Sequence, residues 1–249
     1  MNAQLTFRGK TVTVNLNEAI DLSIPMHPRS DAVLAWYLDP LTIEPVRGDG
    51  FVGEVKQGGS VNFRTISFNP HGHGTHTESL GHITNEIYSV NRCVKNYFHW
   101  AELITIEPEK RGEDQVISLE QVRKKLENTK PEAVIIRTLP NEDDKLQRHY
   151  SSTNPPYLEE AIGVYLREMG VNHLLIDTPS VDREEDGGLL LTHHAFWNVP
   201  ENPRMEATIT ELIYVPNSVA DGAYLLNLGF APFENDASPS RPLLFEIKA

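Results

Sequence analysis

Cysteine is nearly absent from this chain of 249 residues, in which Cys93 is the only one. A single thiol excludes an intramolecular disulfide and a zinc cage built from several thiolates. Basic residues are also scarce, because 22 Lys and Arg stand against 35 Asp and Glu and leave a formal net charge of −13. Such a surface repels phosphate backbones and anionic lipids, so neither nucleic acid nor a membrane is expected as a partner.

Long apolar segments are missing as well. No run approaches the roughly 18 apolar residues that a membrane-spanning helix needs, and residues 1–18 lack the apolar core of a signal peptide. We therefore expect a soluble, cytoplasmic protein. No repeat and no linker rich in Gly, Ser or Pro divides the sequence, and the length suits a single domain over residues 1–249.

Histidine, by contrast, is concentrated in one place. Four of the ten histidines (His71, His73, His76 and His82) lie within twelve residues, where an even spread would place about 0.5. Imidazoles and carboxylates are the ligands that divalent zinc, manganese or iron ions take in proteins. Glu78 follows His76 by two residues, so in an extended segment both side chains point to the same face. The cluster therefore predicts a metal site.

One segment supplies too few separated ligands to close a metal site, so we expect a second one far away in the sequence. The pair His193 and His194 is the candidate, and either could be the distal ligand. Glu211 lies in an otherwise apolar strand, residues 207–215, where a carboxylate is costly to bury unless it is paired or bound to a metal. Alternation along that strand allows Glu211 to face either the solvent or the core.

The hydrophobic pattern predicts a mixed α/β (α+β) domain that is rich in strands at both ends. An alternating pattern around Arg8-Gly9-Lys10 indicates a hairpin over residues 4–16. A capping box at Ser118 and apolar residues one turn apart indicate a helix at 119–128. Further expected elements are a helix at 157–170 and strands at 19–24, 61–68 (of the buried type), 101–108, 133–138, 173–178, 207–215, 223–229 and 242–247.

Several motifs resemble one known family. The segment Gly74-Thr75-His76-x-Glu78-x3-His82 resembles the GTHxDxPxH motif of the cyclase family of metal-dependent hydrolases, which includes bacterial kynurenine formamidases and isatin hydrolases. Four further segments resemble the family's other motifs in the same order: the DLS strand, the DTPSVD segment, the strand that ends on a glutamate, and the DASPVR turn, found here at residues 20–23, 176–182, 210–212 and 236–241.

This resemblance implies a swivelling β/β/α domain that assembles as a homodimer or homotetramer. It also implies one or two divalent ions, zinc or manganese, in each subunit. The ligands carried over by position are His76, Glu78, His193 and Glu211. His82 takes the position of the general acid or base.

The sequence departs from the family pattern near the first ligand. The family has a histidine four residues before the GTH histidine, whereas this chain has Gly72, flanked by His71 and His73. Either neighbour could fill the position, with His71 slightly preferred. Glu78 also stands where the family has an aspartate, which keeps the ligand type but lengthens the side chain by one bond.

The function that the resemblance implies is hydrolysis of an amide-type C–N bond in a small molecule, such as a formamide, an amide or a cyclic lactam, as in an arylformamidase. A bound divalent ion would lower the pKa of its water toward about 7 and so provide the nucleophile. Trp36 and Trp197 are candidates for the substrate pocket. Two alternatives remain: a cupin-type oxygenase or isomerase, because residues 71–78 also match a cupin motif, and a metal-binding protein without catalytic activity.

Overall fold

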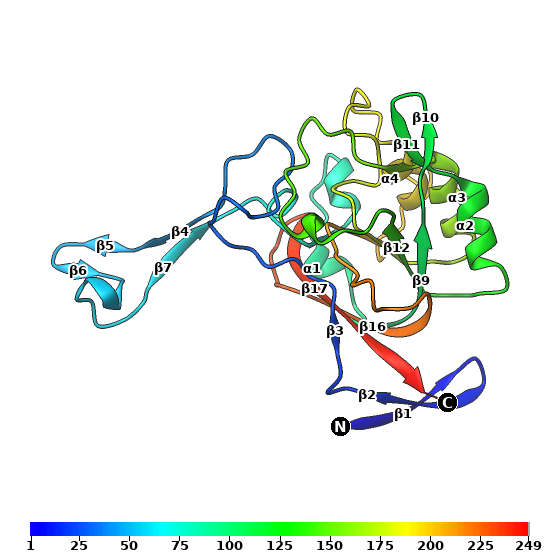
Figure 1. Cartoon of the computed structure of the whole chain (residues 1–249), viewed down its shortest axis with the longest axis horizontal. Coiled ribbons are helices and arrows are strands. Elements are labelled where there is room, and N and C mark those ends of the chain that lie inside the picture. Colours follow the sequence, from blue (N-terminus) through cyan, green and yellow to red (C-terminus); the bar gives the residue numbers. More distant parts are fainter. Residues whose placement is uncertain (249) are drawn as a thin grey trace.

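A barrel-like sheet lies at the centre of the computed structural model, which describes residues 1–248 (Figure 1). Parallel strands form one side of the barrel, and antiparallel strands complete it. Strand β17 pairs with both β16 and β8 and so closes the ring. Within the described residues the order is β8 (His76–Glu78), β15 (Thr208–Glu211), β14 (His173–Ile176), β12 (Ala133–Thr138), β9 (Phe98–Ile106), β16 (Gly222–Phe230) and β17 (Ala237–Lys248).

Further strands extend the barrel sheet or form smaller sheets of their own. The expected N-terminal hairpin is confirmed as β1 (Asn2–Phe7) and β2 (Lys10–Asn15), which extend the sheet beyond the end of β17. The short strand β3 (Ile20–Asp21) also pairs with β17. A separate three-stranded sheet contains β10 (Glu109–Arg111), β11 (Asp114–Ile117) and β13 (Tyr157–Leu158).

Helices cover the outer face of the parallel strands (Figure 1). Helix α2 (Leu119–Leu126) begins at the expected capping box, in which Ser118 and Gln121 satisfy each other's backbone N–H groups. Helix α3 (Glu160–Glu168) is shorter than expected because Tyr157 and Leu158 form strand β13. The sequence pattern did not indicate α4 (Leu191–Trp197), whose seven residues span only two turns. The remaining helical segments are α1 (Val90–Cys93), η1 (Val55–Gln57), η2 (Leu80–Ile83) and η3 (Asp143–Leu146).

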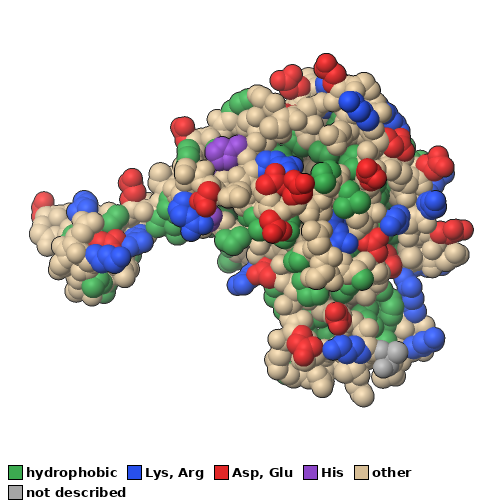
Figure 2. Space-filling model, viewed as in Figure 1, with side chains coloured by type: hydrophobic (Ala, Val, Ile, Leu, Met, Phe, Trp, Pro, Cys, Tyr) green, Lys and Arg blue, Asp and Glu red, His purple; other side chains and the backbone are tan. Residues whose placement is uncertain are grey.

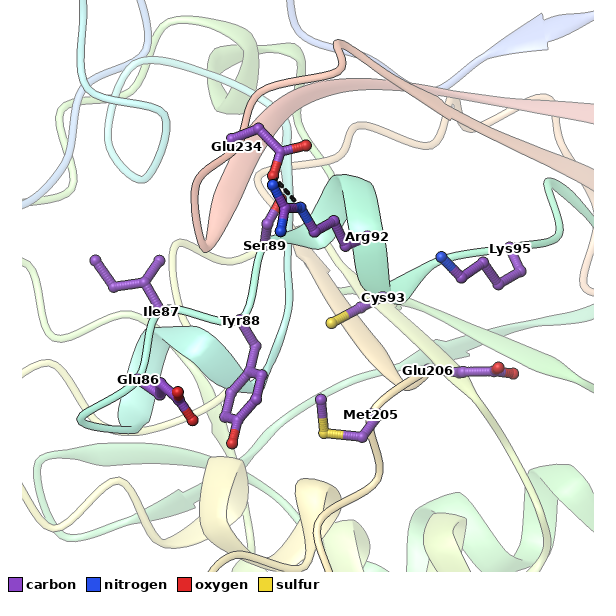
Figure 3. A pocket seen from close by; sticks show the side chains of 10 residues that line it. All are labelled: Glu86, Ile87, Tyr88, Ser89, Arg92, Cys93, Lys95, Met205, Glu206 and Glu234. Atoms are coloured by element: carbon purple, nitrogen blue, oxygen red, sulfur yellow. Dashed lines mark ion pairs between the residues drawn. The ribbon is translucent and has the colours of Figure 1, made fainter.

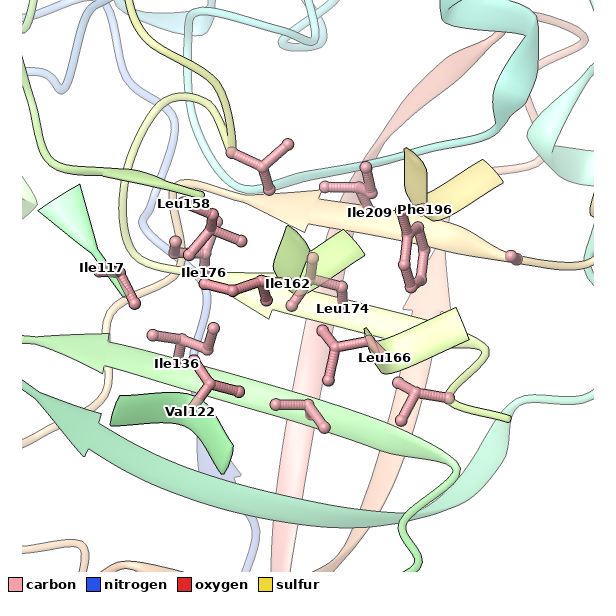
Figure 4. Close-up of a cluster of buried hydrophobic side chains, with 14 of the residues drawn as sticks. Ile117, Val122, Ile136, Leu158, Ile162, Leu166, Leu174, Ile176, Phe196 and Ile209 are labelled. Atoms are coloured by element: carbon pink, nitrogen blue, oxygen red, sulfur yellow. The ribbon is translucent and has the colours of Figure 1, made fainter. Parts of the chain in front are cut away.

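The core has two halves, one on each face of the parallel strands. Because successive side chains alternate across a strand, Ile136 of β12 packs outward against the helices while Ile135 packs into the barrel. Val122 from α2, Ile162 from α3 and Phe196 from α4 complete the outer half (Figure 4). Full burial of such a side chain contributes about 1.5–3 kcal/mol. These layers confirm the mixed α/β class.

A β-arm, residues 42–67, projects from the barrel (Figures 1 and 2). Its strands are β4 (Thr42–Pro45), β5 (Arg47–Gly48), β6 (Phe51–Val52) and β7 (Arg64–Ser67). Strand β7 is exposed on both faces because its partner is β4 rather than a strand of the barrel. The expectation of a buried strand there was therefore wrong. Across residues 1–248 no helix combines the length and apolarity needed to cross a bilayer.

Candidate metal centre

A cavity of about 310 Å³ lies where the β-arm joins the barrel. Leu38 and Asn69, which flank the arm in sequence, form part of its wall. The rest of the lining comes from residues that are spread along the sequence, namely Trp36, His71, His82, Ser180, Leu190, His193 and Glu211. The predicted histidine cluster and the predicted distal segment therefore meet at one cavity.

Strand β8 presents His76 and Glu78 on one face, as their two-residue spacing predicts. Strand β15 runs antiparallel to β8, and its register places Glu211 directly opposite His76. The Oε2 atom of Glu211 lies 3.4 Å from Nε2 of His76. Of the two orientations that alternation allows, the structure places Glu211 inside the cluster, where it is almost completely buried.

Glu78 is at the middle of the cluster and is fully buried. Its Oε1 lies 3.1 Å from Nε2 of His193, while its Oε2 lies 3.2 Å from Nδ1 of His71 and 4.0 Å from Nε2 of His76. The Oε2 atom of Glu78 and the Nε2 atom of His76 are both buried without a hydrogen-bond partner among the described residues. A buried polar atom left unpaired is costly, so each calls for a further partner such as a cation.

Two of these histidines are held through the ring nitrogen that faces away from Glu78. Nδ1 of His193 is 2.6 Å from Oδ2 of Asp182, and Nδ1 of His76 is 3.1 Å from the carbonyl oxygen of Gly74. Histidines that bind metals in proteins usually donate their second N–H to a carboxylate or a carbonyl in this way. The contact leaves Nε2 of each ring as the available ligand atom.

The structure separates the two histidines that flank Gly72. His71 turns into the cluster, whereas both ring nitrogens of His73 are engaged elsewhere. Nδ1 of His73 accepts from the backbone N–H of Asn69 at 2.7 Å, and Nε2 is 2.8 Å from the carbonyl oxygen of Asp39. The histidine cluster around Glu78 therefore contains His71 and does not include His73.

His82 lies at the rim of the cluster on η2, where its side chain is about one-third exposed. Its Nδ1 is 3.3 Å from Oδ2 of Asp236 and 3.9 Å from Oε2 of Glu78. No hydrogen bond within residues 1–248 uses its Nε2 atom. His82 is thus a cavity-lining histidine with one anchored and one available nitrogen.

Electrostatics in this cluster favour positive charge beside Glu78. Burial lowers the pKa of His193, but hydrogen bonds with Asp182 and Glu78 outweigh burial and raise it to about 10. Burial likewise lowers the pKa of His71, and its contacts with Asp236 and Glu78 raise it to about 10. For Glu78, burial favours the neutral form, yet the charge of His82, the hydrogen bond with His193 and the close contact with His71 hold its pKa well below the ordinary value. In the polypeptide alone, protons supply the charge that a metal ion would supply.

The distances between candidate ligand atoms fit a divalent ion. Two ligands at about 2.1 Å from a tetrahedral zinc ion lie about 3.4 Å apart, and the distances from Glu78 and Glu211 to His71, His76 and His193 span 3.1 to 4.0 Å. The ligand atoms of His71, His76 and Glu78 all lie within 4.8 Å of one another, and so do those of Glu78, His82 and His193. Glu78 belongs to both groups and is therefore the central residue among the potential ligands.

The remaining predicted residues lie at different distances from this centre. Trp36 lines the cavity. Trp197 does not: one turn after His193 on α4, with the two ring centroids 5.5 Å apart, it is fully buried in the core, where its Nε1 donates to the carbonyl oxygen of Ala207 at 2.9 Å. Of the two distal candidates, His193 enters the cluster, while His194 has its Nδ1 near the carbonyl oxygen of Val199 at 3.2 Å.

Sequence reasoning assigned no role to Asp182 and Asp236, the two carboxylates behind the histidines. Both lie in loops, where no hydrophobic period indicates which way a side chain points. The only available signal was their position in the segments 176–182 and 236–241, which resemble family motifs.

A second, larger cavity of about 570 Å³ is lined by a different set of residues (Figure 3). Its lining includes the buried thiol of Cys93 and the ion pair between Arg92 and Glu234, with 2.5 Å between Nε and Oε2. No histidine lines it. Among residues 1–248, the groups of three or more closely spaced potential metal ligands all lie around the smaller cavity.

Comparison with known proteins agrees with this architecture. The sequence model of the Cyclase family ("Putative cyclase") matches residues 20–183, about two-thirds of the chain. The chain therefore belongs to the Cyclase family. No curated protein sequence matches it.

Solved structures share the fold at low sequence identity. Isatin hydrolase A from Ralstonia solanacearum is 15% identical with a TM-score of 0.67, over 92% of this chain and 91% of that one. An isatin hydrolase bound to the product analogue thioisatinate is 14% identical with a TM-score of 0.64, over 93% of each chain. A potential metal-dependent hydrolase with cyclase activity is 15% identical with a TM-score of 0.63, over 92% of this chain and 97% of that one.

Proposed function

We propose that the protein is a divalent-metal-dependent hydrolase that cleaves an amide-type C–N bond in a small molecule, such as a formamide, an amide or a cyclic lactam. The observation that carries this proposal is the pair of buried, unpartnered atoms, Oε2 of Glu78 and Nε2 of His76, which face each other in a set of ligands suited to zinc or manganese. Membership of the Cyclase family and the fold shared with isatin hydrolases support it.

The residues that would hold the ion are His71, His76, Glu78, His193 and Glu211. A divalent ion bound there supplies Lewis-acid polarisation of a carbonyl and an acidified water at neutral pH. Glu78 and Glu211 contribute the negative charge that attracts the cation, and the burial of both strengthens that attraction. Asp182 keeps the ring of His193 in the orientation that directs its Nε2 toward Glu78.

His82 is the proposed general acid and base. Its anchored Nδ1 fixes the ring, so Nε2 can take a proton at the cavity and return it to the departing nitrogen of the substrate. Trp36, Leu38 and Leu190 form an apolar part of the wall. A cavity of about 310 Å³ with such a wall suits a small, partly aromatic substrate.

The experiment is a hydrolysis screen of aryl formamides, simple amides and cyclic lactams with protein that has been stripped of metal and reloaded with zinc or manganese. Turnover that requires the ion and disappears with Glu78→Gln is the expected result. Absence of turnover across the panel, in protein that still binds the ion, would contradict the hydrolase and favour a metal-binding protein without catalytic activity.

We propose in addition that the protein forms a homodimer or homotetramer through the β-arm. An isolated two-stranded hairpin is marginally stable in water, and this arm exposes five large apolar side chains: Phe51, Val55, Val61, Phe63 and Ile66. Its three acidic and three basic residues cancel, in a chain whose net charge is −13. The arm can therefore approach a second copy with little charge repulsion.

A further inference from the structure

Asp236 lies between two histidines of the centre. Its Oδ2 atom is 3.0 Å from Nε2 of His71 and 3.3 Å from Nδ1 of His82. The pairing of β17 with β8 places Ala237 opposite Glu78, and the backbone N–H of Ser79 donates to the carbonyl oxygen of Asp236 at 2.9 Å. The barrel itself therefore fixes the position of this carboxylate.

The contact with Asp236 decides which nitrogen of His71 is available. When Nε2–H of His71 donates to Asp236, the lone pair of the ring is on Nδ1, which lies 3.2 Å from the unpartnered Oε2 of Glu78. The same arrangement occurs on the other side of Glu78, where Asp182 holds His193. Two carboxylate–histidine pairs thus converge on one central carboxylate.

The surroundings of Gly72 explain why the imidazole beside Glu78 comes from His71 and not from position 72. A Cβ atom at position 72 would lie 2.8 Å from the carbonyl oxygen of Ala35 and 2.5 Å from a methyl group of Leu38. The carbonyl of Gly72 also accepts a hydrogen bond from the backbone N–H of Ala35 at 3.0 Å. Position 72 therefore has no room for a side chain, and the ring that reaches Glu78 comes from the preceding residue.

We propose that Asp236 is a positioning residue of the metal centre, which orients His71 so that Nδ1 is its ligand atom and at the same time anchors His82 at the cavity rim. This inference rests on the proposed metal-dependent function. It links one potential ligand and the proposed acid–base residue through a single carboxylate oxygen, so a change at Asp236 acts on both.

The test measures the affinity for Co²⁺ by competition with a chelator, together with the visible absorption spectrum of the Co²⁺-loaded protein. Asp236→Ala is expected to weaken binding about 10- to 100-fold, as loss of a carboxylate behind a ligating histidine does, and to alter the spectrum. Asp236→Asn is expected to restore most of the affinity, because its amide oxygen can still accept from Nε2–H of His71.

Matched variants separate this effect from a general loss of structure. Glu234→Gln removes a carboxylate two residues away that pairs with Arg92 rather than with a histidine, and it should keep wild-type affinity. Asp182→Ala should weaken binding to a similar degree as Asp236→Ala. If Asp236→Ala does not fold, Asp236→Ser carries the same prediction, because its hydroxyl is too short to reach His71.

Wild-type affinity and an unchanged spectrum in Asp236→Ala would overturn the inference. Loss of one complete equivalent of Co²⁺, with the rest bound normally, would also overturn it, since Asp236 would then be a ligand itself. So would wild-type protein that binds no Co²⁺. Because no substrate is needed, a failure of the hydrolysis screen with intact metal binding would refute the proposed function and leave the role of Asp236 standing.

Discussion

Glu78→Gln is the sharpest perturbation of the candidate centre. The substitution preserves the size of the side chain and removes the charge that His71 and His193 face at 3.2 and 3.1 Å. It also replaces one potential ligand oxygen of the carboxylate by an amide nitrogen, which is a poor ligand for a divalent ion. We therefore expect the affinity for zinc or manganese to fall at least 100-fold.

The size of the effect follows from linkage between binding and folding. Free ion at 100 times its Kd stabilises the folded state by about 2.7 kcal/mol. For a chain of this length, 1 kcal/mol corresponds to about 2–4 °C in Tm, so wild-type protein should gain about 5–10 °C. At the same ion concentration, a variant with 100-fold weaker binding retains about 0.4 kcal/mol, which is about 1–2 °C.

The assay is a thermal unfolding series with and without the ion, in which each variant is compared with its own metal-free form. That comparison removes the cost of losing the buried ion pairs of Glu78. Glu206→Gln, in the separate cavity of Figure 3, is the matched control and should show the full wild-type shift. A full shift in Glu78→Gln would refute the assignment of this carboxylate to a metal centre.

Three further predictions address other parts of the molecule. His82→Ala should lower kcat about 100- to 10,000-fold while leaving the affinity for the ion within threefold of wild type, and an unchanged kcat in steady-state assays would exclude the acid–base role. Burial, with the charges of His99 and Arg204, lowers the pKa of His173 to about 3. Between pH 6.5 and 3 the unfolded chain therefore binds a proton that the folded chain does not, so stability falls as the pH drops. From pH 7 to 5.5 the contribution of His173 to stability should fall by about 1 kcal/mol, measured in urea unfolding as the change in the difference between wild type and His173→Gln; a difference that stays constant with pH would argue against a buried neutral imidazole. Phe63→Asp combined with Ile66→Asp should yield monomers in sedimentation analysis, whereas Ile87→Asp, also at an exposed site, should not; persistence of the wild-type assembly would exclude the β-arm as the interface.

The sequence predicts those parts of the candidate site that depend on residue type and on the alternation of side chains along a strand. The alternation of β8 placed His76 and Glu78 on one face, and a carboxylate in an apolar strand identified Glu211 as unusual. Asp236 could not be assigned in the same way, because only the pairing of β17 with β8 brings it to the histidines.

The fold likewise divides into elements that local sequence signals predict and elements that they do not. Capping and periodicity predicted α2 and the strands of the parallel region, because those signals are local. The β-arm shows where local pattern fails, because alternation in β7 is the same whether a strand enters a barrel or projects into solvent. Similarly, α4 has only seven residues, too few for a helical period to stand out.

The three residues of β8 close the barrel and carry two candidate ligands at once. Opening this strand would separate β15 from β17 and dismantle the centre in the same event. The amide protons of these strands should therefore exchange with solvent as one cooperative unit. An ion bound to His76 and Glu78 would stabilise the closed barrel. The measurable signature is slower hydrogen exchange in β15 and β17, including residues that do not contact the ion.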